Sequence, residues 1–128
     1  MAKYAHSDIL DGGLAALRAA AVRVLVLKAY TAADSYATVT GNALNNTTIS
    51  TADFAALSGA DGSPRVLAFS GKSATATANS GATPNLHIAF TDGSAKVLWV
   101  TDETSDQVIT SGNTITIPGF NCSANQPT

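Results

Sequence analysis

The sequence predicts a mainly β protein with a single domain, a β-sandwich or a jelly-roll-like barrel with an extended N-terminal arm and one short N-terminal helix. The chain has 128 residues, a length typical of one domain. Short runs of alternating apolar and polar residues fill its second half. Turn residues separate these runs at intervals of roughly 8–12 residues, as in sandwiches. The expected organisation is an arm (1–10), one β domain (11–120) and a polar C-terminal tail (121–128).

The first ten residues carry apolar side chains without a helical or strand period, namely Tyr4, Ile9 and Leu10. Such a segment is typical of an extended arm, and two placements are open for it. It either docks on a neighbouring protein through these side chains or folds back onto its own sheet.

A short helix is expected directly after the arm. Asp11 is a suitable N-cap, and Leu14 and Leu17 lie three residues apart on one face. The two glycines that follow Asp11 weaken this helix by about 1 kcal/mol each relative to alanine, so we expect only about two or three turns.

Residues 22–28 predict a strand that is apolar on both faces. Three valines share one face, and Leu25 and Leu27 share the other. Such a strand is either central in a sandwich or covered by the helix and arm. Association of several copies would be another way to bury its second face.

Residues 31–63 are the least regular part of the chain. Within them, residues 50–54 predict a helical turn and residues 60–64 a tight turn with glycine and proline. Strands are expected at residues 65–70 and at residues 73–79, where threonine and alanine alternate.

The strongest local signal is a hairpin around Asp92 and Gly93. Asp-Gly between two alternating runs favours a two-residue turn. This turn pairs residue 88 with residue 97 and residue 86 with Trp99, which makes one side apolar. His87 and Ala89 are then expected to face outward. A short strand around Val108 and a last strand at residues 113–117 complete the prediction.

Composition indicates a chain that associates with other proteins. Only 12% of the residues are charged, against roughly 25% in an average soluble domain, and 28 are serine or threonine. Such a weakly charged surface suits side-by-side packing. The net charge of −2, with scattered basic residues, argues against nucleic acid as a partner. A secretory signal and an apolar run long enough for a membrane are not seen, so synthesis in the cytoplasm is expected.

We find no arrangement that predicts catalysis, and no cofactor or metal is expected. The two histidines, His6 and His87, lack the spacing of a catalytic triad, and Cys122 stands alone. One acidic cluster could offer oxygen ligands to a hard cation, although it lacks the EF-hand pattern. Its carboxylates belong to Asp102, Glu103 and Asp106.

Three segments, residues 9–14, 96–101 and 110–118, resemble a family of small bacteriophage virion proteins encoded among head and capsid genes. Residues 31–63 do not share this resemblance. Members of this kind are similar to capsid cement, or decoration, proteins. The resemblance implies a homotrimer on the outer face of the shell, with the major capsid protein as its partner. The expected contact residues are Tyr4, Ile9, Leu10, Leu25 and Leu27.

Two other functions remain open at this point. One is a different virion role, as a tail, head-fibre or connector component. The other is a carbohydrate-binding module, a frequent function of sandwiches. Such modules need exposed aromatic rings, for which Tyr30 and Tyr36 are the candidates, because Trp99 is expected in the hairpin core.

Overall fold

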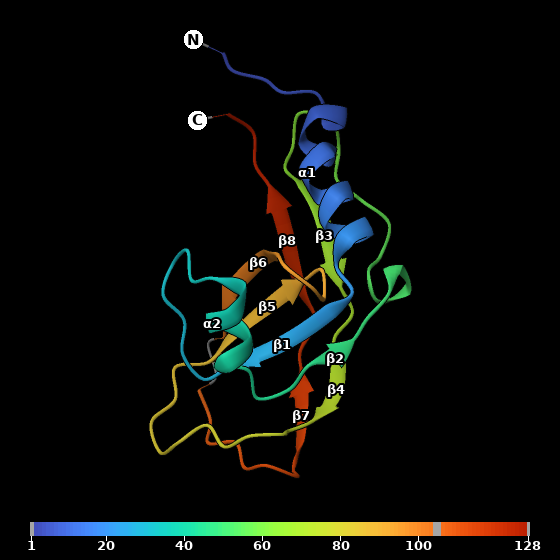
Figure 1. The fold of residues 1–128 in the computed structure, drawn as a ribbon. Coiled ribbons are helices and arrows are strands. Elements are labelled where there is room, and N and C mark those ends of the chain that lie inside the picture. The colour runs from blue at the N-terminus through green and yellow to red at the C-terminus, as the bar shows by residue number, and fades with distance from the viewer. Residues whose placement is uncertain (1, 104–105, 128) are drawn as a thin grey trace.

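The computed structural model describes residues 2–103 and 106–127. Most of its regular structure consists of strands in antiparallel pairs, which confirms the prediction of a mainly β chain. The elements in chain order are α1 (Ser7–Ala20), β1 (Arg23–Leu27), α2 (Tyr36–Gly41), β2 (Thr47–Thr48), the 3₁₀ turn η1 (Thr51–Asp53), β3 (Arg65–Phe69), β4 (Lys72–Thr75), β5 (His87–Thr91), β6 (Val97–Asp102), β7 (Thr114–Ile117) and β8 (Phe120–Ala124) (Figure 1).

One sheet has four strands in the order β2-β1-β5-β6. The expected strand at 22–28 is therefore central, because β1 lies between two neighbours. On its β2 side the buried side chain of Asn45 continues the pairing: its Oδ1 accepts from Val26 N at 2.7 Å, and its Nδ2 donates to Val24 O at 3.1 Å. This amide replaces backbone partners that the two-residue strand β2 is too short to supply.

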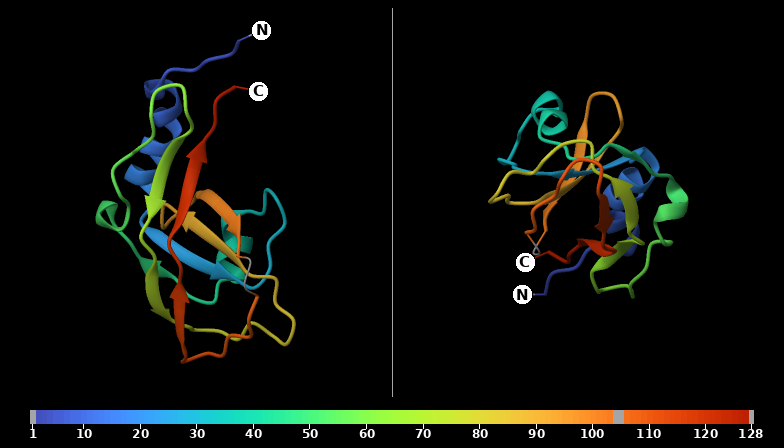
Figure 2. Two further views of the ribbon diagram at one scale, coloured as in Figure 1. Left: turned by 180° about the vertical axis from the view of Figure 1, so that it is seen from behind. Right: turned by 90° about the horizontal axis from the view of Figure 1, so that it is seen from below.

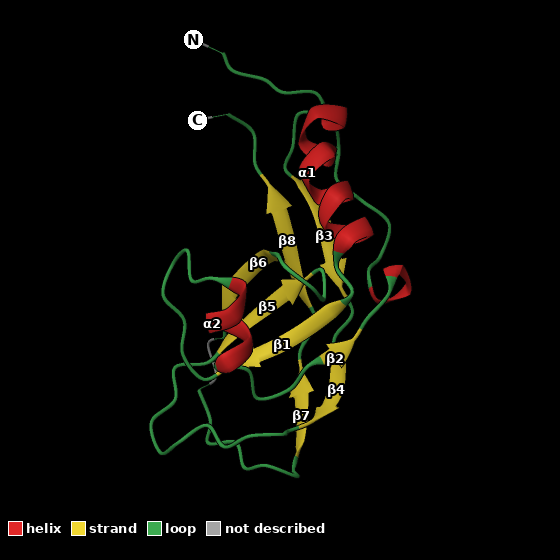
Figure 3. Cartoon of the chain, viewed as in Figure 1, coloured by secondary structure: helices red, strands yellow, loops and turns green. Residues whose placement is uncertain are grey.

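The remaining strands form a long antiparallel ribbon, in which β3 pairs with β8 and β4 pairs with β7 (Figure 3). The register runs from Arg65 opposite Ala124 to Thr75 opposite Thr114, with a break between the two pairs. Figure 2 shows that the ribbon passes behind the four-stranded sheet along the length of the molecule.

The main core lies between α1, the inner face of the sheet and the ribbon. Leu14 and Leu17 are the buried residues of α1, as their spacing predicted. A group of aromatic rings fills the centre, with centroids between 5.1 and 5.7 Å apart. It comprises Phe54, Phe69, Phe90 and Phe120.

A second, smaller core lies on the opposite face of the sheet, under α2. Leu25, Leu27 and Ala89 are fully buried there against Val39 of α2. Ser35 caps this helix by accepting from Thr38 N at 3.2 Å. The expectation that Ala89 faces outward is therefore wrong, because a short helix from the irregular region covers this face.

Helix α1 begins earlier than predicted. It starts at Ser7, and its cap is His6, whose Nδ1 accepts from Asp8 N at 3.1 Å. Asp11 is instead inside the helix and forms an ion pair with Arg65 of β3, Oδ1 to Nε 2.6 Å. The arm is thus shorter than ten residues, because Ile9 and Leu10 belong to the helix.

The hairpin forms, but its predicted register and turn are wrong. Phe90 lies opposite Trp99 and Thr91 opposite Val97, with a β-bulge between these pairs. The loop is longer than two residues because Asp92 Oδ1 accepts from the backbone N–H groups of residues 94, 95 and 96, at 2.9–3.0 Å. These bonds wind residues 93–96 around the carboxylate.

The last part of the chain has more regular structure than expected, since β8 (Phe120–Ala124) extends into the polar tail that was predicted at residues 121–128. The strand expected around Val108 is absent from the described part of the chain. Ile109 instead exchanges hydrogen bonds with the backbone and hydroxyl of Ser80. The helical turn at 50–54 and the strands at 65–70 and 113–117 are confirmed within one or two residues.

The strand expected at residues 73–79 ends at Thr75, yet its alternation persists. Ala74 and Ala76 are buried while Thr75 and Thr77 are exposed. The alternation beyond β4 is held by a backbone bond from Ala76 N to Asn113 O at 2.8 Å.

Candidate interaction surface

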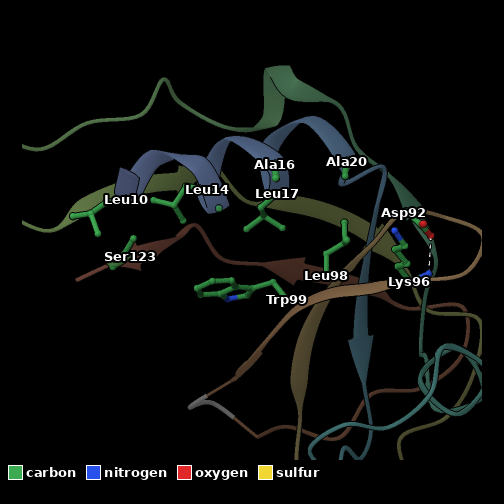
Figure 4. Close-up of a pocket in the computed structure, with 12 residues that line it drawn as sticks. Leu10, Leu14, Ala16, Leu17, Ala20, Asp92, Lys96, Leu98, Trp99 and Ser123 are labelled. Carbon is green, nitrogen blue, oxygen red and sulfur yellow. Dashed lines mark hydrogen bonds between the residues drawn. The ribbon is translucent and has the colours of Figure 1, made fainter. Parts of the chain in front are cut away.

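An apolar groove of about 490 Å³ runs between α1 and β6 (Figure 4). In the close-up, the side chains of Leu14 and Leu17 point from the helix toward β6, and Leu98 and Trp99 line the opposite side. The groove is lined by Leu10, Gly13, Leu14, Ala16, Leu17, Ala20, Asp92, Lys96, Leu98, Trp99, Ser123 and Ala124.

The groove stays open because α1 presents small residues along its rim. Gly13, Ala16 and Ala20 recur three and four residues apart, so they share one side of the helix. Larger side chains at these positions would fill the space above Trp99. The helix gains little burial on that side, since all three residues are exposed.

Strand β6 forms the other wall, and among the described residues it is an edge strand that pairs only with β5. Its first five side chains, residues 97–101, are all half-buried, whereas β5 is buried from Ile88 to Thr91. A second hollow lies between the end of β6 and Phe120 of β8. The chain therefore presents a half-exposed apolar edge with hollows on its core side.

The hydrogen bonding of β5 shows which backbone groups point outward from β6. Glu103 N donates to Leu86 O at 2.9 Å. Because hydrogen-bonded and non-hydrogen-bonded pairs alternate in an antiparallel ladder, the N–H and C=O groups of Val100 and Asp102 point away from β5. These are the groups that a further strand would bind.

Charges mark the two ends of the edge. Asp92 and Lys96 lie where β6 begins. The pKa of Asp92 is lowered to about 2, because its carboxylate accepts hydrogen bonds from the backbone N–H groups of residues 95, 96 and 94, in decreasing order of effect. Asp102 lies where β6 ends, with 68% of its side chain exposed. The edge thus starts next to an exposed lysine and finishes with a carboxylate.

The arm is attached to its own chain in this structure. Tyr4 Oη donates to Asp61 Oδ2 at 2.6 Å, and Ser7 N donates to Asp61 Oδ1 at 3.1 Å. These bonds lower the pKa of Asp61 and raise that of Tyr4. Ala5 exchanges two hydrogen bonds, at 2.9 and 3.0 Å, with the Gln126 side chain. Of the two placements considered for the arm, the isolated chain shows the folded-back one.

The expected contact residues do not form one surface. Tyr4 and Ile9 are 57% and 74% exposed, and Leu10 lines the groove. Leu25 and Leu27 are fully buried under α2, so they are not surface residues of this chain. Sequence reasoning missed the groove because α1 was expected to start later and Trp99 to lie within the hairpin core.

The residues considered for chemistry are engaged in structural contacts. His87 lies against the Tyr30 ring, with centroids 5.6 Å apart, and its side chain is only 14% exposed, so the expectation that it faces outward is wrong. Its Nδ1 is 3.0 Å from Asn85 O and its Nε2 is 3.8 Å from Asp102. Cys122 is buried in the main core.

The acidic residues near the end of β6 also have structural roles. Asp106 Oδ1 accepts from Leu86 N at 2.7 Å, which ties the loop after β6 to the start of β5. Within the residues that the structure describes, three or more metal-ligating side chains do not gather at any point.

Comparison with known proteins returned no match to a family model, a curated protein or a solved structure. Among the described residues, no helix has the length and apolar character needed to cross a membrane.

Proposed function

We propose that this chain is a non-enzymatic structural protein of a bacteriophage particle that binds the outer face of the capsid as a cement, or decoration, protein. The observation that carries the proposal is that two segments far apart in the sequence lie next to each other in the fold. Two of the segments that resemble phage virion proteins, residues 9–14 and 96–101, line opposite walls of the same groove. A shared surface built from both segments fits a common docking role.

The chemistry of the groove fits a protein partner. Its walls are mostly aliphatic and aromatic, and the charged Asp92 and Lys96 lie at one end. Interfaces of this kind combine an apolar centre with a polar rim. The partner proposed is the major capsid protein, with a homotrimer as the form in which the chain covers the shell. The sandwich-like body in this proposal has the four-stranded sheet and the ribbon as its two layers.

The first experiment is quantitative mass spectrometry of purified particles that carry this chain. A copy number comparable to that of the major capsid protein, or one third of it, supports decoration. A few copies per particle would instead support a tail, head-fibre or connector role. Absence from the particle would refute the structural role.

A matched pair of variants tests whether the groove is the docking surface. Ala16 lines the groove and its neighbour Ala15 does not, although both are exposed on α1. Ala16→Arg should reduce the copies retained on the particle, because the guanidinium occupies the groove. Ala15→Arg should leave them unchanged. Equal retention of both variants would exclude the groove as the capsid contact.

A further inference from the structure

We propose that β6 is a self-pairing edge, on which β6 of a second copy binds antiparallel about a two-fold axis near Trp99 and Val100. This contact uses the strand that also forms one wall of the groove proposed above as the capsid contact, but its argument does not rest on that proposal. A two-fold contact between copies would join neighbouring assemblies rather than build a trimer.

The first argument is the composition of the edge. Residues 97–101 read Val-Leu-Trp-Val-Thr, without a proline or an internal charge. Natural proteins protect open edges with short strands, lysines, prolines or bulges, because an open apolar edge pairs with other chains. The bulge lies at the start of β6, and the stretch from Trp99 to Asp102 pairs regularly with β5. This stretch is therefore straight enough to template a further strand.

The second argument identifies the occupant by charge. Lys96 precedes β6, and Asp102 and Glu103 end it. Antiparallel pairing about a two-fold axis brings the start of one strand next to the end of the other, so each lysine meets the carboxylates of the other copy. If both ends carried the same sign, symmetric pairing would bring like charges together. Opposite signs make the edge complementary to itself.

Lys96 and Asp102 are available for such a contact. Among the described residues, Lys96 takes part in no ion pair, while the side chain of Asp102 is mostly exposed and lies 3.8 Å from His87 Nε2. Other charges near these groups are Asp92, beside Lys96 at the hairpin loop, and Glu103, next to Asp102 in the chain. The second copy adds one lysine next to the exposed carboxylate of Asp102.

The third argument concerns Trp99 and the outward backbone groups. The N–H and C=O groups of Val100 point away from β5 and would bind the second strand. Trp99 lies in the middle of β6, half-buried at the groove. A two-fold axis near it places both indoles close together. Buried aromatic residues at the centre of an interface contribute most to its affinity.

The test is a charge exchange followed by sedimentation equilibrium on the full chain. Lys96→Glu and Asp102→Lys each place like charges together at both ends of the dimer, so each should raise its dissociation constant roughly tenfold. The double variant restores opposite charges and should recover most of the affinity. Lys28→Glu is the control, because Lys28 follows β1, two strands away from β6.

Two further readouts locate the contact. Trp99 is the only tryptophan of the chain, so its emission should shift to the blue as dimers form. Amide hydrogen exchange at Val100 and Asp102 should slow in the dimer and not in the Lys96→Glu variant. A chain that stays monomeric at all concentrations would overturn the proposal. So would an assembly that the double variant fails to restore, or one that leaves the Trp99 emission and the exchange rate of the Val100 amide unchanged.

Discussion

Gly71 and Gly119 lie against each other where the long ribbon bends. A Cβ atom added to Gly71 would be 3.0 Å from Gly119 N and 2.8 Å from Ile117 O. A Cβ atom on Gly119 would be 2.8 Å from Phe69 O. The two strands can therefore pass at this distance only because neither residue has a side chain.

Alanine at this bend should destabilise the fold. Gly71 has φ +91°, so Gly71→Ala adds backbone strain of roughly 1–2 kcal/mol to the cost of the close contact. Gly112 has the same φ, and a Cβ atom added to it would have no other atom within 4 Å. Gly112→Ala therefore measures the backbone strain without the close contact. Urea unfolding should show a larger loss for Gly71→Ala. Equal losses would mean that the close approach adds nothing.

Alanine in the helix should have the opposite effect. Gly12 lies within α1 and is exposed, and a Cβ atom added to it would have no other atom within 4 Å. Gly12→Ala should raise the free energy of unfolding by about 1 kcal/mol, because glycine is that much less favourable in a helix interior. Thermal melting followed by circular dichroism measures the change. A decrease would indicate that α1 is not helical at this position in solution.

The second core predicts a large effect for a residue first expected at an intermolecular surface. Leu27 is fully buried against α2, so Leu27→Ala should cost roughly 2–5 kcal/mol of stability in the monomer. Ile9→Ala is the control, since Ile9 is 74% exposed. Chemical denaturation of both variants, at a protein concentration too low for self-association, measures the two losses of stability. Similar small losses would place Leu27 at the surface.

The loop at Asp92 predicts a specific dependence on acid. Its pKa is about 2 in the folded chain, below the ordinary value of 3.8. A lowered pKa stabilises the folded chain above the ordinary value, and this contribution is lost as the pH falls from about 4 toward 2. Asp92→Asn should therefore flatten the decline of stability in this window. The same decline in both proteins would show that the carboxylate does not hold the loop.

Cys122 predicts a dependence in the alkaline range. Burial raises the pKa of this thiol to about 11 from 9.0. A raised pKa means that the folded chain disfavours the thiolate, so stability is lost as the pH rises from about 9 toward 11. Cys122→Ala should remove that dependence. In the native chain at neutral pH, the thiol should react with a disulfide reagent far more slowly than in urea.

The patterns that the sequence revealed best are those fixed by near neighbours. The alternation of alanine and threonine places Ala74 and Ala76 inside and Thr75 outside, as expected. Spacing also identified Leu14 and Leu17 as the buried face of α1. In these cases the period of the backbone alone decides which side chains are buried.

The errors arose where a side chain replaced a backbone partner or where distant segments meet. Asp92 extends a turn that Asp-Gly would otherwise close in two residues, and Asn45 extends β2 beside β1. Helix α2 has only six residues, too few for a periodic signal. The groove also escaped prediction, because it depends on how α1 meets an edge strand that comes much later in the chain.

The exchange of hydrogen bonds between Ala5 and Gln126 has a practical consequence for the topology. It brings both ends of the described chain to the same end of the molecule, near the start of α1 (Figure 1). Termini this close can be joined by a short linker, and new ends can be opened in the exposed turn at residues 60–63. The order of the elements along the chain is thus open to circular permutation, and a peptide joined to either end of the described chain would emerge on one side.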